Sequence, residues 1–211
     1  MFLKTPLFNL TEFPNVYDPS EDTFLLLDAL ESDIGEILRS KPTFLLEVGS
    51  GSGVVVTSLS SVVNSSVCFA VDVNIEACRA TARTSKINNV DVEICCMNLF
   101  SNFLHGLFDL IVFNPPYVVT DSEEIRGDGL AKAWAGGRRG REVIDKFLEK
   151  LPSLLSARGV CYLVVLKEND PSDIASVVRG RGLETRVIKE RKIRGEHLFV
   201  LKFFRISAPN L

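Results

Sequence analysis

The feature of this sequence that most constrains its fold is an alternation of short apolar runs with stretches of helical periodicity. Continuous apolar runs bounded by turn residues occur at 43–48, 67–72, 92–96, 108–113 and 160–166. Apolar residues recur at helical spacing in the stretches 54–61, 75–87, 142–156 and 172–180. Runs of Val, Ile, Leu and Phe without polar alternation are typical of strands that helices cover on both faces. The order therefore predicts a doubly wound, parallel α/β sheet.

Two further apolar stretches, at 183–189 and 198–204, follow the last of these helices with no helix between them. Parallel neighbours need a long crossover connection, so these two are expected to form an antiparallel end to the sheet. The sequence thus predicts a seven-stranded, mostly parallel sheet in a single domain spanning residues 1–211. Its 46% apolar content is sufficient for one such core.

A helix is also predicted before the first strand. Asp18-Pro19-Ser20-Glu21 has the pattern of a helix start, with Asp18 as the N-cap and Pro19 at the first helical position. Apolar residues then recur at helical spacing over 19–39, and Lys41-Pro42 ends the pattern.

Composition excludes several classes of protein. The formal net charge of −3 lacks the basic excess that is usual for a nucleic-acid-binding surface. No apolar run is long enough to span a bilayer, and no signal peptide is evident, so a cytosolic or nuclear location is expected. The five cysteines form no CxxC pair and are expected to be buried, reduced thiols, so neither a disulfide framework nor a metal site is predicted. The two histidines are isolated, which leaves little scope for histidine-based nucleophilic catalysis.

A glycine-rich run, Glu47-Val48-Gly49-Ser50-Gly51-Ser52-Gly53, directly follows a predicted strand and opens a helix. Glycines at 49, 51 and 53 allow a ligand to approach the backbone at the carboxyl end of the strand. A dinucleotide fingerprint would need glycine where the chain has Val54. The run instead resembles motif I of class I methyltransferases. Their cofactor has no pyrophosphate to bind, so the third glycine can lie at a different position. A tight turn without a ligand is the alternative.

Polar residues at the ends of the next two predicted strands extend this site. Asp72 lies about 20 positions beyond the glycines, where a carboxylate can accept hydrogen bonds from both hydroxyls of a ribose. It could also serve only as an N-cap for the following helix. Asn98 follows the third strand and could read the edge of an adenine, and Leu99 could cover its face.

The most specific motif is Asn114-Pro115-Pro116-Tyr117, at the end of the fourth predicted strand. An amide nitrogen is a poor nucleophile because its lone pair is delocalised into the carbonyl. The side-chain oxygen of Asn114 can accept one N–H of such a nitrogen, and the carbonyl of Pro115 can accept the other. Neither Pro115 nor Pro116 offers a competing backbone donor, and Tyr117 can stack on a planar group. The motif therefore predicts methyl transfer to a planar nitrogen, assisted by orientation and electrostatics.

The sequence resembles the eukaryotic and archaeal branch of the HemK/PrmC-type glutamine methyltransferases, which modify class I translation release factors. The resemblance covers nearly the whole chain and rests on the segments 16–24, 47–53, 112–119 and 133–137. It implies an enzyme with the class I methyltransferase fold. This enzyme would use S-adenosylmethionine to methylate the glutamine of a Gly-Gly-Gln motif. It further implies an obligate heterodimer with a small zinc-binding activator subunit.

The same resemblance implies roles for individual residues. Tyr17 and Thr23 would lie over the cofactor, so that residues 1–40 cover its site. Glu47, Gly49 and Asp72 would bind the cofactor, and Asn114 would hold the substrate. The family usually has Asp at the position of Asn98, and the Asn retains an acceptor but removes a charge.

Other functions are compatible with parts of this pattern. A DNA N6-adenine methyltransferase faces the same nitrogen chemistry, but it would have to flip a base and grip the backbone. Relatives are reported to act on histone lysine or on DNA adenine. A catalytically silent binding subunit is a further alternative, although the glycine run and the Asn114–Tyr117 motif are both intact.

Two more segments carry functional expectations. The loop 117–139 is long for a compact domain, and it is expected to close on a peptide substrate. Trp134 and Gly136-Gly137 would then shape the channel for the glutamine, unless Trp134 is an ordinary core residue. The strand over 92–97 is expected at an edge of the sheet, where an activator subunit could add a strand unless the N-terminal segment shields it.

Overall fold

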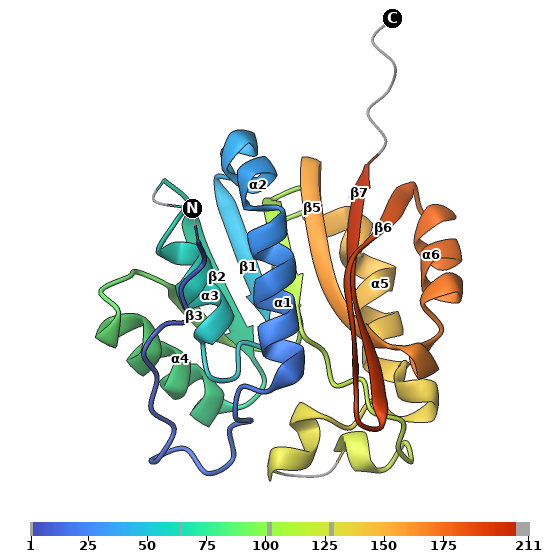
Figure 1. Ribbon diagram of the computed structural model, residues 1–211, viewed down its shortest axis with the longest axis horizontal. Coiled ribbons are helices and arrows are strands. Elements are labelled where there is room, and N and C mark those ends of the chain that lie inside the picture. The colour runs from blue at the N-terminus through green and yellow to red at the C-terminus, as the bar shows by residue number, and fades with distance from the viewer. Residues whose placement is uncertain (1, 64, 101–102, 127–128, 206–211) are drawn as a thin grey trace, which may run out of the picture.

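The computed structural model describes residues 2–63, 65–100, 103–126 and 129–205 (Figure 1). Across these residues the sheet has seven strands in the order β3-β2-β1-β4-β5-β7-β6. All neighbours are parallel except those of β7, which is antiparallel to both β5 and β6. The predicted sheet and its antiparallel last strand are therefore confirmed. The strands are β1 (Phe44–Val48), β2 (Val67–Asp72), β3 (Glu93–Cys96), β4 (Phe108–Phe113), β5 (Leu155–Leu166), β6 (Leu183–Ile193) and β7 (Glu196–Arg205).

Helices cover both faces of this sheet. The helices α1, α3 and α4 pack on one face, and α5 and α6 pack on the other (Figure 1). The central strands consequently contribute nearly continuous runs of fully buried apolar side chains. Within the described ranges, no helix is long and apolar enough to cross a membrane. The helices are α1 (Glu21–Ser32), α2 (Ile34–Ser40), α3 (Val54–Ser60), α4 (Ile75–Ile87), α5 (Glu142–Leu154) and α6 (Pro171–Arg179).

The prediction of one helix that starts after Asp18 is wrong in two respects: the helix starts later, and it is divided into two. The helix α1 begins only at Glu21, and the chain leaves helical geometry at Asp33 before α2 begins. The carboxylate of Asp33 accepts hydrogen bonds of 2.8 Å from the hydroxyl of Tyr162 and from the buried ammonium of Lys202. These donors lie on β5 and β7, so the residue between the two helices makes tertiary contacts that the helical pattern does not contain.

The arrangement of β1 and β4 fixes the place of the functional site. From β1 the chain moves to β2 on one side, and it returns to the other side of β1 as β4. Ligands bind at such a switch point, just beyond the carboxyl ends of the strands. The register pairs Val48 of β1 with Phe113 of β4, which brings Gly49 and Asn114 side by side at this point.

The edge position predicted for the third strand is confirmed, because β3 is an outer strand of the sheet. The N-terminal segment does not run along it. Lys4 accepts a hydrogen bond from Ser58 of α3, and Leu7 exchanges hydrogen bonds with Asn88 at the end of α4. The segment therefore covers α3 and α4, while Cys96 on β3 remains exposed.

The five cysteines are free thiols. Burial is as predicted for Cys68, Cys78 and Cys161, whereas Cys95 is only half-buried and Cys96 is exposed at the edge. In the described part of the chain, no group of three or more His, Cys, Asp and Glu side chains is placed to hold a metal ion.

Candidate active site

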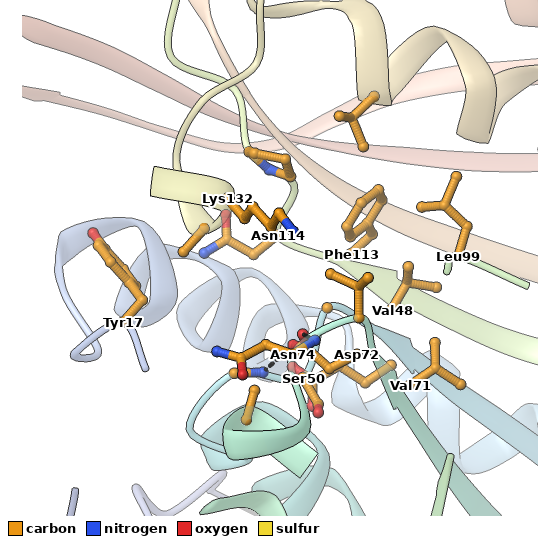
Figure 2. Close-up of a pocket in the computed structure, with 18 of the residues that line it drawn as sticks. Tyr17, Val48, Ser50, Val71, Asp72, Asn74, Leu99, Phe113, Asn114 and Lys132 are labelled. Carbon is orange, nitrogen blue, oxygen red and sulfur yellow. Dashed lines mark hydrogen bonds between the residues drawn. The ribbon is translucent and has the colours of Figure 1, made fainter. Parts of the chain in front are cut away.

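A cavity of about 390 Å³ lies at the carboxyl ends of β1, β2 and β4 (Figure 2). Pockets for small molecules typically enclose about 300–1,000 Å³. Figure 2 shows Tyr17 and Leu99 toward opposite ends of the cavity, with Asp72 and Asn114 between them. The predicted site residues that line it are Tyr17, Thr23, Glu47, Gly49, Gly51, Asp72, Asn98, Leu99, Asn114 and Pro116.

The glycine loop after β1 serves two purposes. Gly51 has a φ of +50°, and a Cβ there would meet nothing within 4 Å, so its backbone is open to the cavity. Gly53, by contrast, does not line the cavity. A Cβ at Gly53 would lie 2.6 Å from Cα of Thr81, so this glycine allows α3 to pack closely on α4.

Asp72 links the glycine loop to the end of β2. One of its carboxylate oxygens accepts a hydrogen bond of 3.0 Å from the amide of Gly51, and the other accepts one of 2.8 Å from Asn74. Burial raises the pKa of Asp72, and these two hydrogen bonds oppose that rise. A carboxylate has about four lone-pair sites. Asp72 therefore retains acceptors for the hydroxyls of a ribose while it holds the loop in place.

Glu47 lies at the end of β1 and is 4% exposed. Its carboxylate accepts a hydrogen bond of 2.8 Å from the amide of Val56, in the first turn of α3. Burial raises the pKa of Glu47 well above its usual range, the bond from Val56 opposes this, and the nearby charge of Asp72 adds to it. Glu47 thus satisfies an amide of the first helical turn and presents a carboxyl group to the cavity.

Asn114 occupies the position that its motif predicts, at the end of β4 on the cavity wall. Its side-chain nitrogen donates a hydrogen bond of 2.9 Å to the carboxylate of Asp22. Its side-chain oxygen is buried and has no hydrogen-bond partner among the described residues. Buried acceptors are normally satisfied in a folded protein, so this atom is a candidate contact for a ligand.

The rest of the motif is divided between two places. Pro116 lines the cavity, whereas Pro115 is buried and does not. Tyr117 also lies outside the cavity, and its hydroxyl donates a hydrogen bond of 3.0 Å to Asp22. Tyr117 instead borders a smaller cavity of about 290 Å³ together with Trp134. Because Tyr17 and Asp22 line both cavities, the two are adjacent.

Asp22 is a site residue to which the sequence analysis assigns no role. It is 5% exposed and lies in the first turn of α1. It accepts hydrogen bonds from Asn114 and Tyr117, and more distantly, at 3.5 Å, from Tyr17. The position of Asp22 in the segment 16–24 is the one signal in the sequence that could have indicated its role. The apolar periodicity of the helix gives no indication of it.

The described residues of the loop after the motif are held to one another and to the segment that follows β5. Its described residues include three short 3₁₀ turns, and Val118 pairs with Ala135 as an isolated parallel bridge. The side chain of Asn169, which is fully buried after β5, donates hydrogen bonds to the carbonyls of Tyr117 and Arg139 at 2.9 and 3.0 Å. Asn169 thereby holds both ends of the loop 117–139.

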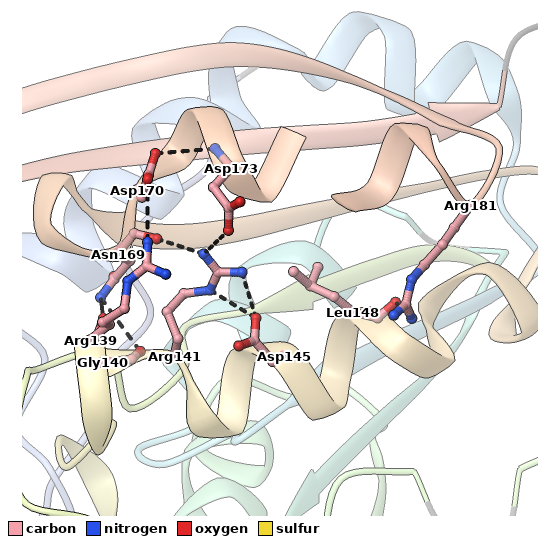
Figure 3. Close-up of polar contacts among 9 residues, drawn as sticks. All are labelled: Arg139, Gly140, Arg141, Asp145, Leu148, Asn169, Asp170, Asp173 and Arg181. Carbon is pink, nitrogen blue, oxygen red and sulfur yellow. Dashed lines mark hydrogen bonds and ion pairs between the residues drawn. The ribbon is translucent and has the colours of Figure 1, made fainter. Parts of the chain in front are cut away.

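A buried arginine, Arg141, holds Asn169 in position (Figure 3). The guanidinium of Arg141 donates to the carbonyl of Asn169 and to Asp173 at 2.9 Å each, and to Asp145 at 2.6 Å. The network joins the start of α5 to the start of α6. Hydrogen bonds to charged groups are worth about 1.5–3 kcal/mol each. The backbone around Tyr117 is therefore held by rigid elements.

The glycines of the loop do not provide the peptide channel that the sequence suggests. A Cβ at Gly136 would lie 2.8 Å from the carbonyl oxygen of Pro116, and one at Gly140 would lie 1.9 Å from that of Tyr117. A Cβ at Gly137 would lie 2.5 Å from the side chain of Ile125. The space beside these glycines is already filled by the chain itself, and the absent side chains of Gly136 and Gly140 allow the loop to pack against the backbone of Pro116 and Tyr117.

The sheet order, the glycine loop at the switch point and the carboxylate at the end of β2 together define a class I methyltransferase. Comparison with known proteins agrees with this class. The profile of the Methyltransferase small domain family matches residues 18–128. The Homo sapiens protein Methyltransferase HEMK2 is 45% identical over 195 residues, which cover 90% of each chain. The chain therefore belongs to the Methyltransferase small domain family and groups with the HEMK2 methyltransferases.

Other relatives extend this comparison. A putative protein N5-glutamine methyltransferase of Methanocaldococcus jannaschii is 29% identical over 98% of this chain and 100% of its own. Among solved structures, the E. cuniculi Mtq2-Trm112 complex, described as responsible for methylating the eRF1 termination factor, matches with a TM-score of 0.70. It is 28% identical, and the match covers 91% of this chain and 99% of that one. The T. thermophilus methyltransferase RsmC, solved with AdoMet and guanosine, shares only the fold, at 16% identity and a TM-score of 0.63.

Proposed function

We propose that this chain transfers a methyl group from S-adenosylmethionine to the side-chain nitrogen of a glutamine, in the Gly-Gly-Gln motif of a class I translation release factor. The observation that carries the proposal is the buried, unpartnered side-chain oxygen of Asn114 on the cavity wall. An acceptor in that place suits a substrate nitrogen that still bears hydrogen. The name of the M. jannaschii relative, a putative protein N5-glutamine methyltransferase, supports a glutamine acceptor, and the E. cuniculi complex, described as methylating the eRF1 termination factor, supports a release factor as substrate. We also propose the cytosol as the compartment, because translation takes place there.

The donor set of the cavity fits S-adenosylmethionine. Asp72 offers free carboxylate lone pairs to the ribose, and Gly51 offers open backbone. Asn98 and Leu99 lie on the wall where an adenine would bind, and Tyr17 and Thr23 lie on the wall formed by the N-terminal segment and α1. The bound cofactor supplies an electrophilic methyl group attached to a sulfonium.

The protein contributes orientation rather than a strong base. The side-chain oxygen of Asn114 accepts one N–H of the glutamine amide. This contact, made from the cavity wall, would turn the nitrogen lone pair toward the methyl carbon. With the cofactor bound, the transfer would form an N–C bond and break the S–C bond, the thioether would be the leaving group, and the displaced N–H proton would pass to water. Acceptors that are fixed before the reaction need no reorganisation as positive charge develops on the nitrogen.

The variant Asn114→Ala tests this role. It should reduce methyl transfer to a release factor by more than about tenfold, or about 1.4 kcal/mol, and leave cofactor affinity within about threefold because the lost contact is made to the substrate. Asn9→Ala, an exposed change in the N-terminal segment, is the control and should retain full activity. Methyl transfer is followed by mass spectrometry with labelled cofactor.

Parallel reactions with adenine-containing DNA and a lysine peptide test the alternative acceptors. Transfer to either substrate in preference to the release factor would reject glutamine as the acceptor. An Asn114→Ala variant that retains wild-type activity would reject the proposed contact.

We further propose that the chain works as a heterodimer with a small zinc-binding activator, which adds a strand to β3. An edge strand with unpaired backbone groups is a site for pairing with another chain. Cys96 on β3 is exposed, and Ile94 on the same strand is half-buried against the core. The pairing of Mtq2 with Trm112 in the E. cuniculi complex supports a partner of this kind.

Charge placed on β3 tests this interface. Ile94→Asp should reduce soluble yield and activity on co-expression with the activator, because it places a carboxylate where the added strand would pack. Val187→Asp, at an exposed position on the opposite edge strand β6, is the matched control. A monodisperse chain that is fully active without a partner would contradict the proposal, as would equal effects of the two variants.

A further inference from the structure

We infer that Asp22 is a positioning residue that fixes the orientation of the Asn114 side-chain amide. In this orientation the oxygen of Asn114, rather than its nitrogen, faces the glutamine nitrogen that receives the methyl group. The inference rests on the proposed function and names a residue on which that function depends. Asp22 and Asn114 are far apart in the sequence, on α1 and at the end of β4. The hydrogen bond of 2.9 Å between the Asp22 carboxylate and the Asn114 side-chain nitrogen joins them.

A side-chain amide has two orientations, related by a half-turn, that exchange its oxygen and its nitrogen. Only the oxygen can accept a hydrogen bond, and only the nitrogen can donate one. An ionised carboxylate accepts and cannot donate, so Asp22 stabilises the orientation in which the nitrogen of Asn114 faces it. The reversed orientation would place two oxygens against each other, and it would present a donor to a substrate N–H.

The surroundings of Asp22 hold its carboxylate in place. The oxygen that contacts Asn114 also accepts a hydrogen bond of 3.0 Å from the hydroxyl of Tyr117. The other oxygen accepts one of 2.7 Å from the backbone amide of Thr23, in the first turn of α1. Amides of a first helical turn lack helical partners and favour negative charge.

The hydroxyl of Tyr117 is suited to remain a donor. Burial raises the pKa of Tyr117, and the charge of Asp22 raises it further, so the phenol stays protonated. Each hydrogen bond that Asp22 accepts in the described chain comes from a neutral group. Asp22 is thus placed to orient Asn114 within a set of neutral hydrogen-bond donors.

This arrangement links the two parts of the chain that the sequence shows as separate motifs. The segment 16–24 supplies Asp22, and the Asn-Pro-Pro-Tyr motif supplies both Asn114 and Tyr117 as donors to it. Tyr117 therefore contributes to the site by holding Asp22, from a position outside the cofactor cavity.

The test uses the active heterodimer and the variant Asp22→Asn, which keeps the shape of the side chain but can present a donor to Asn114. The expected result is a fall in kcat of at least about tenfold, with KM for the release factor and affinity for the cofactor within about threefold. Asp28→Asn, which changes an ion-paired carboxylate on the same helix, is the matched control and should leave kcat unchanged.

A second measurement reports the amide itself and does not require activity. The side-chain amide resonances of Asn114 are assigned in ¹⁵N-asparagine-labelled protein by comparison with Asn114→Ala. They should shift in Asp22→Asn and remain in place in Asp28→Asn. Tyr117→Phe, which keeps the ring and removes one donor to Asp22, provides a milder perturbation and should lower kcat with KM unchanged.

The inference is overturned if Asp22→Asn retains kcat within about threefold of the wild type, if its loss lies entirely in KM or cofactor affinity, or if the Asn114 resonances do not move. Failure of the proposed function looks different. In that case the folded wild-type heterodimer would transfer no methyl group to the release factor, while the resonances would still report whether Asp22 orients Asn114.

Discussion

Substitution of Gly140 by alanine should be among the most damaging single changes in this protein. Gly140 has a φ of +64°, and a Cβ there would lie 1.9 Å from the carbonyl oxygen of Tyr117. Left-handed geometry costs a residue with a side chain about 1–2 kcal/mol. The clash adds to this cost, because the Tyr117 carbonyl is held by a hydrogen bond of 2.9 Å from Asn169 and cannot move without breaking it.

The magnitude follows from these terms. Overpacking of a rigid site costs about 1–3 kcal/mol, and together with the backbone strain the expected loss is about 2–5 kcal/mol of unfolding free energy. At about 2–4 °C per kcal/mol for a chain of this size, the Tm should fall by roughly 4–20 °C. Activity should fall as well, because the displaced carbonyl belongs to the motif that contains Asn114.

Gly182→Ala is the matched control. Gly182 also has a positive φ, +84°, but a Cβ there would meet nothing within 4 Å. It should show only the strain of about 1–2 kcal/mol. Both variants are unfolded with urea in the same partner state as the wild type. Unfolding free energies that agree within about 1 kcal/mol would refute the packing argument.

The remaining predictions concern the cavity. Asp72→Ala removes the acceptor for the amide of Gly51 and for a ribose, so calorimetry should show cofactor binding weakened by about 1–3 kcal/mol; an unchanged affinity would contradict the assignment. Burial raises the pKa of Glu47 in the folded state above its unfolded value, so the folded state binds more protons and stability falls as pH rises from about 4.3 through the folded pKa. Glu47→Gln should therefore flatten the decline of stability with pH in urea unfolding, and a slope equal to that of the wild type would count against this. Trp134→Ala should raise KM for the release factor with little change in Tm, since Trp134 borders the smaller cavity; a large fall in Tm would instead identify it as a core residue.

Much of this molecule could be predicted from local sequence. The apolar runs indicated the strands, because a strand covered on both faces has few other solutions. The antiparallel pairing of the last two strands could be predicted because no helix lies between them in the sequence. The cavity wall was also predictable, since Gly51, Asp72 and Asn114 each lie at or shortly after the carboxyl end of a strand beside the switch point.

The roles of the glycines show where local patterns become ambiguous. Gly51 opens onto the cavity, whereas Gly53 in the same run accommodates Thr81 of α4. In the same way Gly136 and Gly140 lie against the chain rather than against a ligand. A glycine in a sequence indicates close approach, but the approaching group is known only after the chain has folded.

The tertiary structure alone decided how the site is held in place. Asp22 reaches Asn114 across 92 positions, and Asn169 reaches Tyr117 across 52. Asp33, between α1 and α2, meets donors on β5 and β7. The sequence by itself determined the sheet, the glycine loop at the switch point and the place of Asn114 at the end of β4, because those depend on periodicity and on short spacings. Hydrogen bonds between distant segments depend on how the layers pack, and no spacing along the chain encodes them.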